Sequence, residues 1–139
     1  MPYCRTIPIE FNHCDPAGIV FYPRYFEMTN SVTENFFADR VGRSYAQMTM
    51  RDGNGVPTVK IDANFRAPSR LGDRLEFTLQ VLRVGRSSVT LEIAARLGEE
   101  LRMEAELTLV WVSPEGGATP WPADMRARLE AEMQKECKE

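Results

Sequence analysis

The chain of 139 residues is poor in residues on which many sites depend, since it has one histidine and three cysteines. The cysteines, Cys4, Cys14 and Cys137, are odd in number and form no Cys-x-x-Cys pair, so we expect neither a disulfide framework nor a zinc site. No group of His, Cys and Asp has metal-ligand spacing, and no metal is predicted. Reduced thiols fit a cytoplasmic protein.

Long apolar runs are also missing, since none approaches the roughly 20 residues that a membrane helix needs. The first ten residues lack the apolar core of a signal peptide, so we expect a soluble, unprocessed chain. Neither a GxGxxG turn nor a Walker-type loop occurs. The net charge of −3 argues against a general nucleic-acid binder but leaves room for a local basic patch.

Length and composition indicate one globular domain over residues 1–139, because 43% of the residues are hydrophobic and 27% are charged. A first strand is predicted from Tyr3 to Phe11, followed by a loop over residues 12–18 that is rich in turn residues. The apolar spacing then predicts a long helix from about Pro23 to Val41. Gly42 suits the position just past its end.

The second half of the chain alternates apolar and polar residues. The alternating runs are residues 59–65, 75–81, 89–97 and 101–111. Short turns separate them, which is typical of an antiparallel sheet with one buried face. A connection over residues 113–122 leads to a charged helix at about 124–138. The long helix and the single-faced sheet must cover each other, so the pattern alone predicts an α+β fold.

Asp15 is the first candidate for chemistry, because it lies in the loop just before the long helix. Pro16 favours an extended backbone at Asp15, and Gly18 permits a left-handed turn and close approach of a ligand. Amides at a helix start are unpaired and carry partial positive charge, which stabilises an oxyanion. The segment therefore offers a carboxylate and an oxyanion hole. The alternative is a turn or capping role, which is common for aspartate.

His13 is the second candidate. In an extended segment His13 and Asp15 project to the same side and Cys14 to the other, so His13 is expected to tune Asp15 or contact substrate. The same geometry disfavours a Cys14–His13 nucleophilic pair. A single histidine is more often structural than catalytic, and that alternative stays open.

A third candidate is the turn from Arg83 to Ser88, which combines two arginines, two serines and a glycine. Guanidinium groups and hydroxyls of this kind bind phosphates. The alternative is a solvated hairpin without a ligand.

The stretch DPAGIVFYPRY at residues 15–25 resembles the signature of the 4-hydroxybenzoyl-CoA thioesterase family of hotdog enzymes. Weaker motifs of that family follow in the same order, at residues 55–59, 65–69, 72–73 and 85–88. The resemblance extends to about Val112 and leaves out the last helix. It implies the hotdog fold, in which a curved antiparallel β-sheet wraps a long central helix, and an enzyme that needs no cofactor.

The resemblance also implies roles for single residues. Asp15 would act on the thioester as nucleophile or base, and the backbone N–H of Tyr22 would contact the thioester carbonyl. Arg86 matches a basic position and would bind the phosphates of CoA. The local sequence, apart from the resemblance, adds Gly18 and His13 as substrate contacts and the hydroxyls of Ser87 and Ser88 as further phosphate ligands. The resemblance further implies a dimer that pairs two sheets edge to edge, often doubled into a homotetramer, with active sites at subunit interfaces.

One position departs from the family pattern. Members specific for 4-hydroxybenzoyl-CoA carry an acid on the long helix near the aryl ring, and Asn30 stands at that substrate-binding position here. A neutral amide binds a hydroxyl less strongly than a carboxylate does. The predicted function is therefore hydrolysis of an aryl-CoA or a short- to medium-chain acyl-CoA, 4-hydroxybenzoyl-CoA among them. The alternatives are an acyl-carrier-protein thioesterase, a hotdog dehydratase that uses His13, and a non-catalytic acyl-CoA-binding module.

Overall fold

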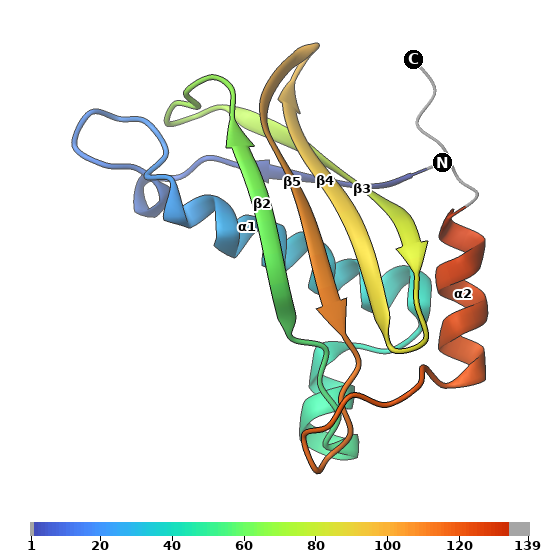
Figure 1. Cartoon of the computed structure of the whole chain (residues 1–139). Coiled ribbons are helices and arrows are strands. Elements are labelled where there is room, and N and C mark those ends of the chain that lie inside the picture. Colours follow the sequence, from blue (N-terminus) through green and yellow to red (C-terminus); the bar gives the residue numbers. More distant parts are fainter. Residues whose placement is uncertain (1, 134–139) are drawn as a thin grey trace.

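The computed structural model describes residues 2–133, which form five strands and two α-helices with shorter helical turns (Figure 1). The elements are β1 (Tyr3–Pro8), η1 (Phe11–His13), α1 (Pro23–Phe36), η2 (Phe37–Val41), η3 (Gln47–Asp52), β2 (Thr58–Phe65), β3 (Arg74–Val84), β4 (Ser88–Leu97), β5 (Glu100–Val110) and α2 (Ala123–Met133). The strands make one antiparallel sheet in the order β1-β3-β4-β5-β2.

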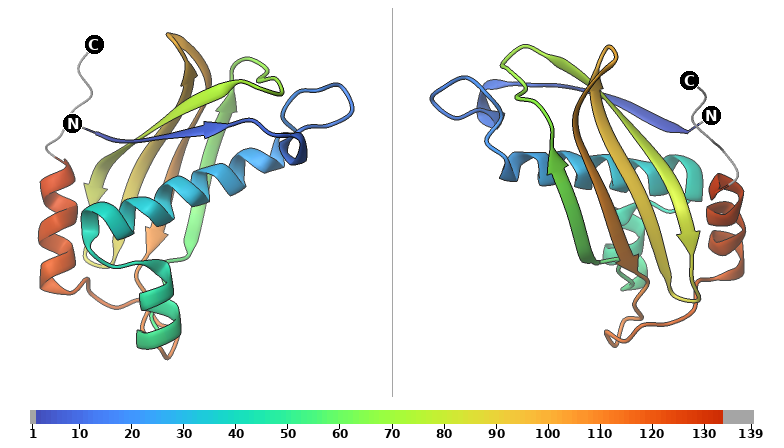
Figure 2. Two further views of the ribbon diagram at one scale, coloured as in Figure 1. Left: turned by 180° about the vertical axis from the view of Figure 1, so that it is seen from behind. Right: turned by 45° about the horizontal axis from the view of Figure 1, so that its top comes forward.

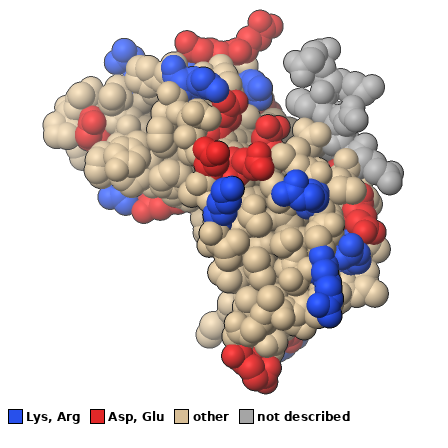
Figure 3. All heavy atoms as spheres, viewed as in Figure 1, with Lys and Arg blue, Asp and Glu red and all other residues tan. Residues whose placement is uncertain are grey.

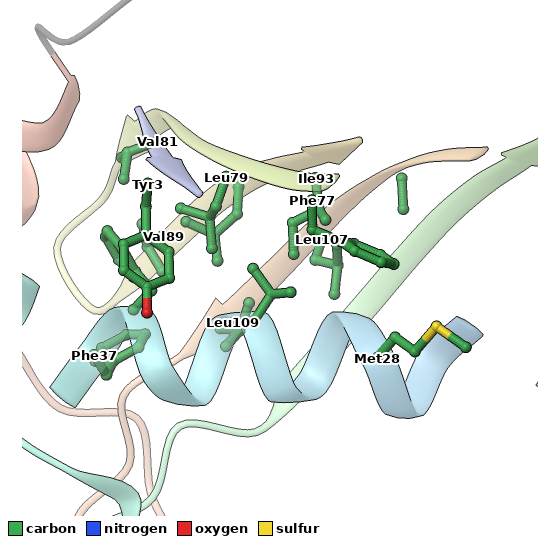
Figure 4. Close-up of a cluster of buried hydrophobic side chains, with 14 of the residues drawn as sticks. Tyr3, Met28, Phe37, Phe77, Leu79, Val81, Val89, Ile93, Leu107 and Leu109 are labelled. Carbon is green, nitrogen blue, oxygen red and sulfur yellow. The ribbon is translucent and has the colours of Figure 1, made fainter. Parts of the chain in front are cut away.

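The sheet curves around α1, which crosses its concave face (Figure 2). The two layers meet because the apolar stripe of the helix and the alternating residues of the strands each need a nonpolar partner. Figure 4 shows side chains of β3, β4 and β5 directed at the helix that carries Met28. Val32 and Phe36 of α1 are completely buried, and each side chain of this kind contributes about 1.5–3 kcal/mol. This arrangement is the hotdog fold, as predicted.

The long helix has the expected limits. Pro23 occupies its first turn, where no N–H is required, and the helical path continues through the wider turns of η2 to Val41. Gly42 ends it with a φ of 93°, a left-handed conformation that glycine adopts without strain. The amide of Gly42 donates to the carbonyl of Phe37 at 2.8 Å.

The first strand is shorter than predicted. It ends at Pro8, and Phe11 lies in the turn η1 with 83% of its surface exposed. The amide of Glu10 donates to Nδ1 of His13 at 2.8 Å, which turns the chain away from the sheet. The alternation of Ile7, Ile9 and Phe11 therefore ends with the buried Ile9.

The prediction of one buried sheet face is confirmed for β3, β4 and β5 and is wrong for β2. The apolar side chains Val59, Ile61 and Phe65 are exposed by 59%, 40% and 45%. The strand β2 pairs with β5 alone and forms an edge of the sheet, so solvent reaches side chains that a neighbouring strand would cover.

The C-terminal helix α2 packs beside β3 and the turn that follows it (Figure 1). Met125 and Leu129 are buried, whereas Met133, one turn further on, is 38% exposed. An ion pair of 2.8 Å between Arg40 and Glu132 ties α2 to η2. The predicted remainder of this helix, to residue 138, lies outside the described residues. Within residues 2–133 no helix has the length and apolar character to cross a membrane.

Candidate active site

Asp15 lies in a tight hairpin between β1 and α1. Cys14 and Val20 form an isolated β-bridge, and the amide of Asp15 donates to the carbonyl of Ile19 at 3.0 Å. The amide of Gly18 returns a 2.9 Å bond to the carbonyl of Asp15. Gly18 has a φ of 80°, so the turn requires a residue that tolerates a left-handed backbone.

The Asp15 side chain is partly buried and makes no ion pair with any residue in the described range. Its Oδ1 accepts a 2.9 Å bond from the amide of Ala17. The carboxylate borders a hollow of about 450 Å³, called the Asp15 hollow below. Its lining residues are Phe11, Cys14, Asp15, Pro16, Gly18 and Leu71.

The N-terminus of α1 leaves one amide free beside this hairpin. Pro23 has no N–H, and the amides of Arg24 and Tyr25 bond back to Phe21 and Tyr22. The Tyr22 amide donates to no acceptor in the described part of the chain, and it lies where the helix presents partial positive charge. This N–H is the donor that remains for a ligand oxygen.

The Tyr22 ring lines a second hollow, of about 270 Å³, called the Tyr22 hollow. Its other lining residues are Ile19, Val20, Tyr25, Phe65, Arg66, Ala67, Pro68 and Ser69. The rings of Tyr22 and Phe65 meet edge to face at 5.9 Å, and those of Tyr25 and Phe65 stack at 5.6 Å. Apolar walls of this kind suit an apolar or aromatic group.

His13 does not face the same side as Asp15, and this prediction is wrong. Its Nδ1 accepts the Glu10 amide, and its ring lines a separate hollow between β1 and α1 with Arg5 and Glu27. The cause is the turn η1, which rotates His13 out of the extended conformation on which the alternation depended.

Cys14 is a poor nucleophile in this setting. Burial raises the pKa of its thiol, and the negative charge of Asp15 raises it further. A thiol with a raised pKa stays protonated at neutral pH, whereas the thiolate is the reactive form. Asp15 is therefore the better candidate for chemistry in the hairpin.

The hairpin is held in place by the segment that precedes β3. The contacts are the Val20 amide to the Ser69 carbonyl at 2.9 Å, the Leu71 amide to the Gly18 carbonyl at 3.0 Å, and a β-bridge between Ile19 and Arg70. The hydroxyl of Tyr25 donates to Oγ of Ser69 at 2.8 Å. Ser69 falls in the family motif at residues 65–69, but the sequence did not indicate a role for Ser69 or Leu71, because nothing in the local pattern indicates contact with residues 18–20.

The turn with Arg86, Ser87 and Ser88 is remote from Asp15 in the same chain. The hairpin contacts the segment before β3 and the turn follows the end of β3, so the 11 residues of β3, at about 3.3 Å each, separate them by roughly 35 Å. The Arg86 side chain is exposed, and the Ser88 carbonyl accepts the indole N–H of Trp121 at 3.0 Å. One chain alone does not combine the predicted phosphate-binding residues with the carboxylate.

Asn30 is exposed on α1 and lines neither the Asp15 hollow nor the Tyr22 hollow. Among the described residues, no group of three or more His, Cys, Asp or Glu side chains has an arrangement that holds a metal ion. Carboxylates gather instead on the outer face of the sheet (Figure 3), around a hollow lined by Asp62, Glu92, Glu104 and Glu106.

Comparison with known proteins assigns the chain to a family. The model of the thioesterase superfamily matches residues 17–104, which are more than half of the chain. The chain belongs to the thioesterase superfamily. The matched region includes Tyr22 and the segment before β3, and it begins after Asp15.

One curated member of the superfamily is similar in sequence. The 4-hydroxybenzoyl-CoA thioesterase of Pseudomonas sp. (strain CBS-3) is 34% identical to this chain over 68 residues. The aligned stretch is 48% of this chain and 48% of that protein, so the chain spans about half the length of the curated relative that it matches.

Solved structures of several thioesterases share the fold. A 1,4-dihydroxy-2-naphthoyl-CoA thioesterase from Synechocystis superimposes with a TM-score of 0.83 at 19% identity, over 93% of this chain and 96% of that one. A gentisyl-coenzyme A thioesterase gives 0.81 at 22% identity, over 88% and 98%. The dynemicin thioesterase, a polyene binder, gives 0.82 at 19% identity, over 95% and 97%. Their ligands differ, so this likeness supports the fold and does not select a substrate.

Proposed function

We propose that this member of the thioesterase superfamily hydrolyses an acyl-CoA to the free acid and CoA. The observation that carries the proposal is the Asp15 carboxylate, which pairs with no described cation, borders a hollow, and lies in the hairpin that leads into α1 and the free amide of Tyr22. A carboxylate and an oxyanion donor are the two groups that attack on a thioester requires.

In this proposal the Tyr22 N–H binds the thioester oxygen and stabilises the negative charge that develops on it. Asp15 acts on the acyl carbon, either by direct attack or by taking a proton from the attacking water. The carbon–sulfur bond then breaks and CoA leaves as the thiol. In the direct route, water subsequently cleaves the acyl-aspartate and regenerates the carboxylate.

The acyl group is proposed to be an aryl or a short to medium aliphatic chain. The Tyr22 hollow, with its aromatic wall of Tyr25 and Phe65, supports an apolar acyl group. The sequence relative acts on an aryl-CoA by its name, which supports the same class. Asn30 lines neither the Asp15 hollow nor the Tyr22 hollow of the same chain, so it does not support a choice of 4-hydroxybenzoyl-CoA over other aryl groups.

The active unit is proposed to be a homo-oligomer in which one chain supplies Asp15 and another supplies Arg86 for the phosphates of CoA. Two observations support it: the two residues are far apart in one chain, and β2 exposes Val59, Ile61 and Phe65 along an edge of the sheet. An apolar edge strand is a surface that a second strand covers.

The test is thiol release from a panel of aryl-CoA and aliphatic acyl-CoA esters by the wild type, Asp15→Asn and a control, Asp52→Asn. Asp52 is an exposed aspartate in η3, so Asp52→Asn is the same chemical change at a position away from the hairpin. We expect Asp15→Asn to lower kcat by at least about 10³-fold and the control to leave it unchanged. An Asp15→Asn enzyme with normal turnover would remove Asp15 from the mechanism.

The same panel, with acyl groups attached to a carrier protein, separates the nearest alternative. Carrier proteins are acidic and dock on basic surfaces, whereas the outer face of this sheet carries a cluster of carboxylates (Figure 3). We therefore expect CoA esters to be the better substrates. Thiol release from the acylated carrier protein alone would mean that carrier-protein thioesters, not acyl-CoAs, are the substrates. Binding of the thioesters without thiol release would mean that the chain is a binding module and not an enzyme.

A further inference from the structure

Arg102 on β5 is a buried cation that joins both ends of the segment before β3. Only 8% of its surface is exposed. Its carbonyl accepts the amides of Arg66 at 2.8 Å and Ala67 at 3.3 Å, where the segment begins. Its Nη1 donates to the Asp73 carboxylate at 2.8 Å, where the segment ends.

The guanidinium makes more contacts in between. Nη1 lies 3.2 Å from the Pro68 carbonyl and 3.2 Å from Oγ of Ser69, and Nε donates to Glu100 at 2.7 Å. Burial alone would lower the pKa of Arg102, but the bonds to Asp73 and Glu100 outweigh it, so the guanidinium stays charged. A planar fork can satisfy acceptors in these several directions at once, and an ammonium cannot.

The segment before β3, which Arg102 contacts at both ends, is hydrogen-bonded to the Asp15 hairpin. Ser69 and Leu71 hold Val20 and Gly18 through backbone hydrogen bonds. Ser69 also accepts the Tyr25 hydroxyl, which connects the same point to the first turn of α1 and hence to the free amide of Tyr22. Arg102 touches neither the Asp15 hollow nor the Tyr22 hollow as a lining residue.

We propose that Arg102 is a positioning residue for the reaction: through Ser69 and Asp73 it sets the place of the Asp15 hairpin relative to the start of α1. The inference rests on the proposed thioesterase function and adds to it the group that fixes the distance between carboxylate and oxyanion donor. A displacement of about 1 Å between reacting groups costs about 10²-fold in rate, so a buried fork that fixes both ends has a large effect on kcat.

The experiment compares steady-state kinetics of the wild type, Arg102→Gln, Arg102→Lys and the control Arg96→Gln with the best acyl-CoA of the panel. Arg96 lies on the neighbouring strand β4, opposite Leu101, and makes no ion pair in the described part of the chain. We expect Arg102→Gln to lower kcat by about 10- to 100-fold with KM within about twofold. Arg102→Lys should restore part of kcat, because it keeps the charge toward Asp73 but loses the fork.

Hydrogen exchange supplies a readout that does not depend on turnover. The amides of Val20 and Leu71 should exchange faster in Arg102→Gln, while amides within β4 keep their rates. If Arg102→Gln does not fold, Arg102→Lys and Ser69→Ala decide, since each is a smaller change in the same contacts.

The outcomes separate the two proposals. Folded Arg102 variants with wild-type kcat, or with unchanged exchange at Val20 and Leu71, would overturn the positioning role while the thioesterase stands. A parallel loss of kcat in Arg96→Gln would also overturn it, because the effect would then be general. A wild type that releases no thiol would overturn the proposed function, and this inference with it.

Discussion

Asp15 and Arg86 lie beyond opposite ends of the same strand, β3, so a single chain holds its candidate carboxylate and its candidate phosphate ligand at opposite ends of that strand. In the proposed oligomer an acyl-CoA therefore lies between two copies of the chain and contacts Asp15 of one and Arg86 of the other. In this proposal, activity depends on subunit association as well as on Asp15.

Arg86→Ala should raise KM for acyl-CoA by about five- to tenfold through loss of a charge-assisted contact, and should leave KM unchanged for a thioester of the same acid that lacks the nucleotide. Steady-state kinetics with both thioesters measures this. Equal effects on the two substrates would remove Arg86 from phosphate binding.

Co-expression of Asp15→Asn and Arg86→Ala chains with different tags tests the shared site. In the purified hetero-oligomer each pair contains one site with an intact Asp15 and an intact Arg86, so activity at low substrate should exceed that of either variant alone. Activity equal to the mean of the two parents would place both residues in one chain.

Tyr22→Pro should separate the backbone amide from the side chain. Tyr22 has a φ of −55°, which proline adopts, so the substitution removes the N–H with little change in path. Tyr22→Ala is the matched control, because it also loses the ring but keeps the N–H. We expect kcat of Tyr22→Pro to fall by about 10²-fold below that of Tyr22→Ala. Similar kcat values in the two variants would mean that another group binds the oxyanion.

Ile61→Asn should weaken subunit association, since Ile61 belongs to the exposed apolar face of the edge strand β2. Lys60→Asn is the control on the same strand, where the neighbouring side chain points to the other face. Sedimentation over a range of protein concentrations should show a smaller species for Ile61→Asn alone, with lower activity at the same concentration. An unchanged mass for Ile61→Asn would place the interface elsewhere.

Asp73→Asn should lower stability in a manner that depends on pH. The Arg70 amide, followed by the Arg102 guanidinium, holds the pKa of Asp73 below its ordinary value of 3.8. A carboxyl group with a depressed pKa in the folded state contributes stability that is complete above the unfolded-state pKa. That contribution is lost as the pH falls through the lower folded-state value.

We therefore expect Asp73→Asn to cost about 1–3 kcal/mol of unfolding free energy near neutral pH, and the difference from wild type to shrink below about pH 4. Urea unfolding at several pH values measures it, with Asp52→Asn as the control. A difference that stays constant into strong acid would show that the Asp73 charge is not the source of the stability.

Much of the fold followed from local patterns. The alternation in β3, β4 and β5 predicted their buried face, because the period of two on a strand places every second side chain against the helix. Pro23 and Gly42 predicted the limits of the long helical segment through their backbone preferences. The same period gave wrong predictions at two places: Phe11 lies outside the first strand, and the apolar side chains of β2 are exposed. Alternation does not reveal where a strand ends or whether a neighbour covers it.

The sequence by itself determined the α+β hotdog fold and the Asp15 to Tyr22 segment, since their hydrophobic period, turn residues and family motif are local properties of the chain. Only the tertiary structure decided that His13 turns away from Asp15, that Arg86 lies at the far end of β3, and that Arg102 holds the segment beneath the hairpin. The contacts of Arg102 join residues distant in sequence, which no local pattern encodes, whereas His13 is turned by a hydrogen bond from Glu10, three residues away, whose geometry the alternation of side chains does not reveal.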